Sequence, residues 1–121
     1  MGQKNGYLLT LKEDADIHHF LPQSKSPAWR QLDVTILHQV IMETFLGIGG
    51  LQRANESNLT YTREELEAVE RIRNGEYQMV FFMNPTKVEE VTAVAGNGEK
   101  MPQKSTFFYP KLPTGLLIMK L

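Results

Sequence analysis

The stretch YQMVFFM, residues 77–83, places the strongest constraint on the fold of this chain. It is a run of apolar and aromatic residues with a single glutamine, and Asn84-Pro85 ends it. Successive residues of a strand point to opposite faces, so an apolar run without alternation is typical of a strand buried on both sides. The sequence therefore predicts an interior strand, with strands at its edges and helices over its faces.

Other segments predict the elements around this strand. Leucine, aromatic and β-branched residues between turn residues predict strands at residues 6–12, 59–61, 105–109 and 115–121. Apolar residues at helical spacing predict helices at residues 34–46, 63–75 and 87–98, and a short helical turn is expected near residues 17–21. The fold class predicted is α+β, with a small, mostly antiparallel (mixed) sheet flanked by about three helices.

Capping residues mark the predicted helix ends. Asp33 suits the N-cap of the first helix, and Gly47 stands where a left-handed residue would end it. Thr62 and Thr86 each begin a T-x-x-E sequence, the spacing of a capping box, in front of the second and third helices. These signals place the helix starts independently of the apolar pattern.

Length and composition favour one soluble domain spanning residues 1–121. A chain of 121 residues can bury a core without covalent staples, and it contains no cysteine for disulfides or thiolate metal sites. Its first residues lack the basic-then-apolar pattern of a signal peptide, and no apolar run reaches the roughly 18 residues of a membrane span. We expect a cytoplasmic protein with no membrane partner.

Charge is unevenly distributed along the chain. The net charge is −1, which argues against a general nucleic-acid partner. All fourteen acidic side chains lie in residues 1–99, whereas residues 100–121 carry four lysines and no acid. An anion would prefer this basic tail, although four lysines are equally compatible with an ordinary solvated strand edge.

Three segments resemble a known protein family. LDVTILH (32–38), YTREELEAVERIRNGEYQMVFFMNPTKVEEV (61–91) and above all GEKMPQKSTFFYPKLPTGL (98–116) resemble the carboxy-terminal part of the bacterial and archaeal family named domain of unknown function 1015. The likeness covers almost the whole chain. Full-length members are longer, and the resemblance implies that their amino-terminal part is missing here.

That amino-terminal part resembles the ParB and sulfiredoxin-like fold used by kinases of free L-serine. The resemblance therefore implies a small-molecule phosphotransferase lineage in which this chain supplies phosphate or donor contacts. It also implies that the catalytic acidic residue lies in the missing half, and that Mg²⁺ accompanies a phosphorylated donor.

The candidate anion-binding residues lie in two turns and at one helix start. Phosphoryl transfer requires positioning and positive charge around the phosphate oxygens, which lysines, hydroxyls and backbone N–H groups supply. The candidates are Lys104, Ser105 and Thr106, then Lys111 and Thr114, and finally Asn84 and Thr86. If Lys104–Thr106 lies on the neighbouring strand, it would converge with the helix start after Thr86. The structural alternative is that the prolines and aromatics of residues 99–116 serve a stiff strand connection, and that Asn84-Pro85-Thr86 is only a turn and cap.

Histidines give weaker signals. His38 is a candidate general base if it lines a cleft, but a half-buried structural histidine is the commoner outcome. His18-His19 lack a third ligand at useful spacing, so no metal site is expected.

The functional alternatives are a kinase-derived domain that binds a phosphorylated small molecule, and a non-catalytic interaction or scaffold domain that docks the missing amino-terminal half or forms a homo-oligomer.

Overall fold

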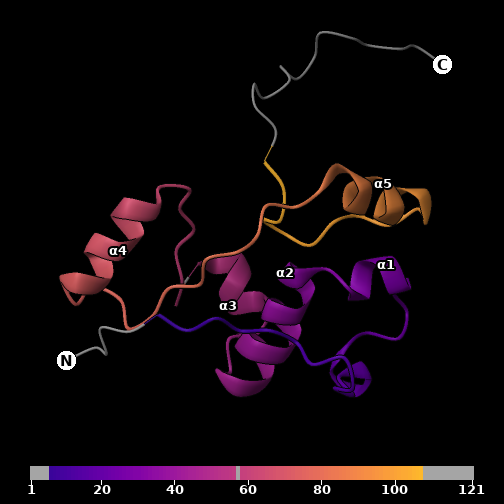
Figure 1. Ribbon diagram of the computed structural model, residues 1–121, viewed down its shortest axis with the longest axis horizontal. Helices are drawn as coiled ribbons and strands as arrows, with labels where there is room; N and C mark the ends of the chain where they lie inside the picture. The colour runs from indigo at the N-terminus through magenta and orange to yellow at the C-terminus, as the bar shows by residue number, and fades with distance from the viewer. Residues whose placement is uncertain (1–5, 57, 108–121) are drawn as a thin grey trace, which may run out of the picture.

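The computed structural model describes residues 6–56 and 58–107, in which the regular secondary structure is helical and long irregular connections join the helices (Figure 1). The elements in chain order are the 3₁₀ helix η1 (His18–Phe20), α1 (Pro27–Arg30), α2 (Asp33–Ile36), the π-helix η2 (Leu37–Phe45), α3 (Gly50–Asn55), α4 (Glu65–Arg73) and α5 (Val88–Gly96). No strand occurs in this part of the chain, so the predicted α+β fold with a sheet is wrong for it.

The segments predicted as strands at 6–12, 59–61 and 77–83 run as connections, and none of their residues belongs to a strand. Of the predicted strand 105–109, residues 105–107 are also not a strand, and residues 108–121 lie outside the described ranges. The physical reason is that an apolar run records a preference for burial, whereas a strand also needs a neighbour about 4.8 Å away to receive its backbone hydrogen bonds. The sequence pattern specifies the first condition and not the second.

The helix predicted at 34–46 is confirmed as the continuous segment formed by α2 and η2. Its N-cap is Leu32 rather than Asp33, and Asp33 is the first helical residue, where its negative charge favours the helix amino terminus. Gly47 ends the helix with φ of +69°, a left-handed conformation that glycine adopts without strain. The π-helical stretch closes with the Leu46 N–H donating to the Ile41 carbonyl at 3.1 Å.

The core lies around α2 and η2, with α1 packed against both α2 and α5. Val94 of α5 and Thr35 of α2 are completely buried. The Thr35 hydroxyl donates to the Trp29 carbonyl at 2.8 Å, which satisfies a polar group inside the helical cluster. The other buried residues are Leu21, Leu32, Leu37, His38, Val40, Met42 and Ala68.

Helix α4 lies at the opposite end of the molecule from α5 (Figure 1) and is largely solvated. Among its residues only Ala68 is buried, and Leu66 is 81% exposed. Arg71 holds the helix to the following turn through an ion pair with Glu76 at 3.0 Å and a hydrogen bond to the Tyr77 hydroxyl at 2.9 Å. Helix α4 is therefore fixed by surface polar contacts more than by burial.

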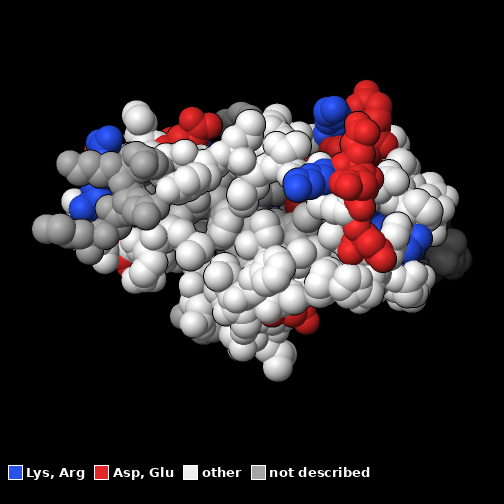
Figure 2. Space-filling model, turned by 60° about the horizontal axis from the view of Figure 1, so that its bottom comes forward, with Lys and Arg blue, Asp and Glu red and all other residues white. Residues whose placement is uncertain are grey.

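On one face of the molecule the charged side chains lie towards the margins (Figure 2). Figure 2 shows a face whose centre carries neither lysine and arginine nor aspartate and glutamate, with acidic side chains gathered in a band at its right side. Among the described residues, no helix combines the length and apolar character needed to cross a membrane.

Candidate functional site

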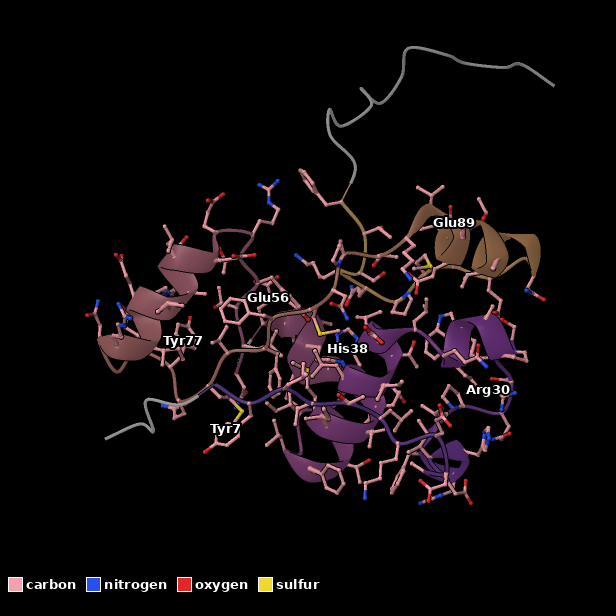
Figure 3. All side chains as sticks on the ribbon, viewed as in Figure 1. Tyr7, Arg30, His38, Glu56, Tyr77 and Glu89 are labelled. Carbon is pink, nitrogen blue, oxygen red and sulfur yellow. The ribbon has the colours of Figure 1, made fainter. Side chains whose placement is uncertain are left out.

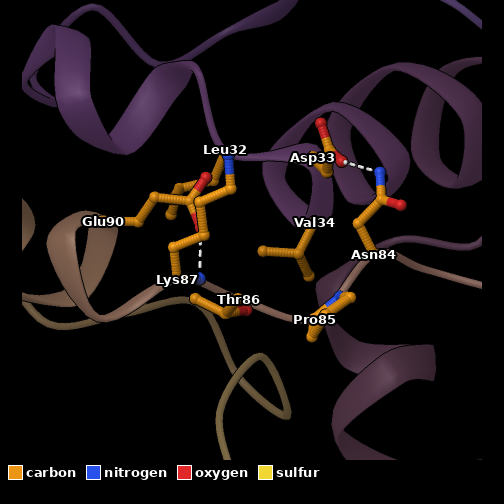
Figure 4. A pocket seen from close by; sticks show the side chains of 8 residues that line it. All are labelled: Leu32, Asp33, Val34, Asn84, Pro85, Thr86, Lys87 and Glu90. Atoms are coloured by element: carbon orange, nitrogen blue, oxygen red, sulfur yellow. Dashed lines mark hydrogen bonds between the residues drawn. The ribbon is translucent and has the colours of Figure 1, made fainter.

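A pocket of about 500 Å³ lies between the start of α2 and the turn that leads into α5 (Figure 4). The two helices present their amino ends to it, because residues 84–87 bring the chain back past the beginning of α2. The residues that line it are Leu32, Asp33, Val34, Asn84, Pro85, Thr86, Lys87 and Glu90.

Two hydrogen bonds fix the pocket walls. The Asn84 side-chain amide donates to Asp33 Oδ2 at 3.0 Å, and this bond ties the turn to the start of α2. The Lys87 backbone N–H donates to Glu90 Oε2 at 2.7 Å and so forms half of a capping box for α5. The cap therefore stands one residue later than the predicted Thr86, whose hydroxyl is used elsewhere.

Thr86 joins two of the three groups of predicted anion-binding residues. Its hydroxyl donates to the Ser105 carbonyl at 2.7 Å, while the Ser105 hydroxyl donates to the Pro102 carbonyl at 2.6 Å. The segment from Asn84 to Lys87 and the segment from Lys104 to Thr106 thus converge, although through loops and not through neighbouring strands. Both hydroxyl protons are committed to backbone carbonyls, so an anion would have to replace one of these bonds to receive a proton from a hydroxyl.

Lys104 occupies a left-handed turn with φ of +58°, an uncommon conformation for a residue with a side chain. Its ammonium contacts Glu56 Oε1 at 3.0 Å and lies 5.5 Å from the centre of the Tyr61 ring. The Lys104 and Glu56 side chains are 52% and 43% exposed. A pair so open to water is weak, so an anion can compete with Glu56 for this cation. Thr106 is exposed, whereas Lys111 and Thr114 lie outside the described residues.

The pocket has no excess of positive charge. Its wall carries one cation, Lys87, and two carboxylates, Asp33 and Glu90. A phosphate group would therefore rely on Lys87 together with Lys104, each of which adjoins one of the bonded residues Thr86 and Ser105. In residues 6–56 and 58–107 no three His, Asp or Glu side chains gather in a way that could hold a metal ion.

His38 lies apart from the pocket, inside the helical cluster (Figure 3). It is 7% exposed, and burial, with a smaller contribution from the positive charge of Arg53, lowers its pKa from 6.5 to about 4. The Arg53 guanidinium donates to the His38 carbonyl at 3.1 Å and to the Ile48 carbonyl at 2.8 Å. The imidazole is therefore neutral at pH 7 and is part of the packing around η2. It does not line the pocket, so it is not placed to act as a general base there.

Sequence reasoning missed a set of contacts between α1 and the loop after α5. Glu99 accepts hydrogen bonds from the Ser26 backbone N–H at 3.1 Å and the Ser26 hydroxyl at 2.5 Å, and the Trp29 indole N–H donates to the Lys100 carbonyl at 3.1 Å. The bond from the Ser26 hydroxyl is the main reason that the pKa of Glu99 falls below its usual range. No sequence pattern predicts bonds between residues 73 apart, but Ser26-Pro27 is a recognisable start for α1.

No protein-family model, curated protein or solved structure matches this chain. The resemblance to the domain of unknown function 1015 family therefore stays a prediction.

Proposed function

We propose that this chain is the phosphate- or donor-contacting part of a small-molecule kinase-like protein, of the kind that the resemblance to the domain of unknown function 1015 family implies. The observation that carries the proposal is the hydrogen bond from Thr86 to Ser105. It joins two sequence segments that were each expected to contact an anion, and it places them beside the pocket at the start of α5.

Lys104 is the main cation of the proposed site. The Lys104 ammonium lies at the surface, where its ion pair with Glu56 is weak. An incoming phosphate would replace the carboxylate of Glu56. Lys87 adds a second positive charge from the amino end of α5. In this proposal the chain positions and neutralises a phosphate, and the acidic group that activates the acceptor belongs to the amino-terminal part of the family.

The proposal is tested by thermal-shift scans against phosphate, pyrophosphate, ADP, ATP and L-serine, each with and without magnesium. We expect a saturable rise in Tm with at least one phosphate compound, because a ligand that binds only the folded state stabilises it. Lys104→Ala should at least halve that rise, whereas the control Lys100→Ala should preserve it. A flat response to every phosphate compound, or equal losses in the two variants, would contradict the proposal.

A second candidate function is a non-catalytic interaction or scaffold domain that docks the amino-terminal half of the family. It is favoured by the segment before η1, in which Leu8 is 92% exposed, Leu9 66% and Leu11 47%. Calorimetric titration with the amino-terminal part of a full-length family member tests it. Binding that Leu8→Lys weakens at least tenfold supports this function, and the absence of binding heat at several temperatures opposes it.

A further inference from the structure

The segment from Gln78 to Asn84 reads almost the same in both directions. Its sequence, QMVFFMN, has Phe81 at its centre, a methionine two residues away on each side, and an amide side chain at each end. The remaining positions, Val80 and Phe82, are both apolar. This symmetry matches the requirement of an antiparallel strand pair that a two-fold axis relates, in which residue i faces residue j and j faces i.

The same segment is open to solvent. Met79 is 52% exposed, Val80 38%, Phe82 58% and Met83 42%. No backbone N–H or C=O group of residues 78–83 bonds to another described residue. The segment also contains no charged side chain, and lysines and similar charges are the usual protection of an exposed strand edge against pairing.

We propose that residues 78–84 form an intermolecular antiparallel strand pair with the same residues of a second copy of this chain. The two-fold axis passes through Phe81, which faces its own symmetry mate. Val80 then faces Phe82 of the second copy, and Met79 faces Met83. Gln78 faces Asn84, so each apolar residue meets an apolar one and each amide meets an amide.

The symmetric arrangement has an electrostatic advantage. The charges that flank the segment are Glu76 and Lys87, and in this register Glu76 faces Thr86 of the second copy. Like charges directly opposite each other would oppose association, and in this register the paired residues contain none. A second copy of the chain can therefore pair with residues 78–84 along their whole length. The inference does not rest on the proposed phosphate site, with which the paired segment shares only Asn84.

The size of the contact predicts a weak dimer. The four exposed side chains each offer on the order of 100 Å² or less, so each copy buries a few hundred Å² of apolar surface. Interfaces below about 1,200 Å² in total are those of weak or transient complexes. We expect a dissociation constant on the order of 10–100 µM.

Sedimentation velocity of the full chain across this concentration range is the first test. The wild type should shift from monomer to dimer, and Phe82→Lys should stay monomeric, because it places two lysines in the paired segment. Leu66→Lys is the matched control, since Leu66 is equally a surface residue but lies on α4. A wild type that is monomeric throughout, or a dimer that Phe82→Lys leaves unchanged, would overturn the proposal and assign the segment to another occupant.

Cysteine cross-linking tests the register, because the natural chain has no cysteine. Phe81→Cys should form a covalent dimer on mild oxidation, because residue 81 faces its own symmetry mate. Val80→Cys alone should cross-link slowly, but a mixture of Val80→Cys with Phe82→Cys should cross-link readily. A parallel pair would instead cross-link every position with itself. The interface would be excluded if Phe81→Cys and the mixture both cross-linked no faster than the control Leu66→Cys.

Discussion

Two regions of the molecule have similarly apolar sequences and opposite environments. In α2 and η2 most apolar side chains are buried or half-buried, with Phe45 exposed at the end of η2, and specific hydrogen bonds such as that from Thr35 to the Trp29 carbonyl lie among them. In residues 79–83 the side chains are all apolar, yet four of the five are exposed, and the backbone groups have no hydrogen-bond partner among the described residues. The difference teaches that hydrophobicity drives burial only where geometry supplies neighbouring surfaces to cover the side chains.

The largest expected effect comes from placing a charge in each region. Val94→Asp puts an unpaired carboxylate where no water reaches, and we expect it to lower the free energy of unfolding by about 3 kcal/mol or more. Val80→Asp adds the same carboxylate in a partly exposed position and should cost less than about 1 kcal/mol. Urea denaturation followed by circular dichroism measures both values.

Dilute protein is needed for this comparison, so that self-association does not contribute to stability. Equal losses of unfolding free energy in the two variants would contradict the distinction between a packed and an uncovered region. A larger cost for Val80→Asp would mean that the segment is covered in solution by another part of the chain or by a partner.

A second, smaller effect concerns pH and the buried His38. Its pKa of about 4 in the folded chain lies below the ordinary 6.5 of the unfolded chain. Between these values the unfolded state binds the extra proton, so stability is complete above about pH 6.5 and falls as the pH drops towards 4. The shift corresponds to a loss of at most about 3 kcal/mol.

The measurement for His38 is the free energy of unfolding at several pH values between 7 and 4, for the wild type and for His38→Gln. The wild type should lose more stability than the variant over this interval, because carboxylates contribute equally to both. Parallel profiles would show that the imidazole reaches water and takes up its proton normally.

The sequence predicted those parts of the fold that depend on local signals. The ends of α4 and α5 lie within two residues of the predicted ends, and Gly47 ends η2 as expected, because helical periodicity and terminating glycines act locally. The predicted N-caps Asp33, Thr62 and Thr86 were wrong, since the N-cap residues are Leu32, Glu64 and Lys87. Helices α1 and α3 were missed, although Ser26-Pro27 is a start signal for α1. The strands were wrong because pairing depends on a partner distant in sequence, which an apolar pattern does not identify.

The candidate site was predicted in part for the same reason. The convergence of Thr86 with Lys104–Thr106 was predicted on the condition that the two lie on neighbouring strands. The described residues form no such strands, yet the hydrogen bond from Thr86 to the Ser105 carbonyl brings the two segments together through loops. The pairing of Lys104 with Glu56 has no sequence signal, since it depends on how two distant loops fold. Asp33 was predicted as the N-cap of the first helix, which is wrong because Leu32 holds that position, and the bond from Asn84 to Asp33 at the pocket was not predicted.

A third effect tests whether polar contacts stabilise the packed region. Thr35→Val keeps the shape of a completely buried side chain but removes the donor to the Trp29 carbonyl. We expect a loss of about 1–2 kcal/mol, because the carbonyl would be left without its partner. Urea denaturation measures the loss, and the fluorescence of Trp29, the only tryptophan, reports whether α1 moves. An unchanged midpoint would mean that water replaces the hydroxyl and that this part of the core is more open than its burial indicates.

The smallest effect distinguishes an ordered loop from a mobile one at Lys104. Lys104→Ala and Lys104→Gly both remove the weak pair with Glu56, but only glycine adopts a φ of +58° without strain. If the turn is held as firmly as the helical region, the glycine variant should be more stable than the alanine variant by about 1 kcal/mol. Thermal unfolding of the two variants measures this difference. A glycine variant that is equally or less stable would mean that the turn samples other conformations, because glycine then only adds freedom to the unfolded chain. Such a result would place the Lys104 loop with the uncovered segments and would remove the fixed geometry on which the proposed phosphate contact depends.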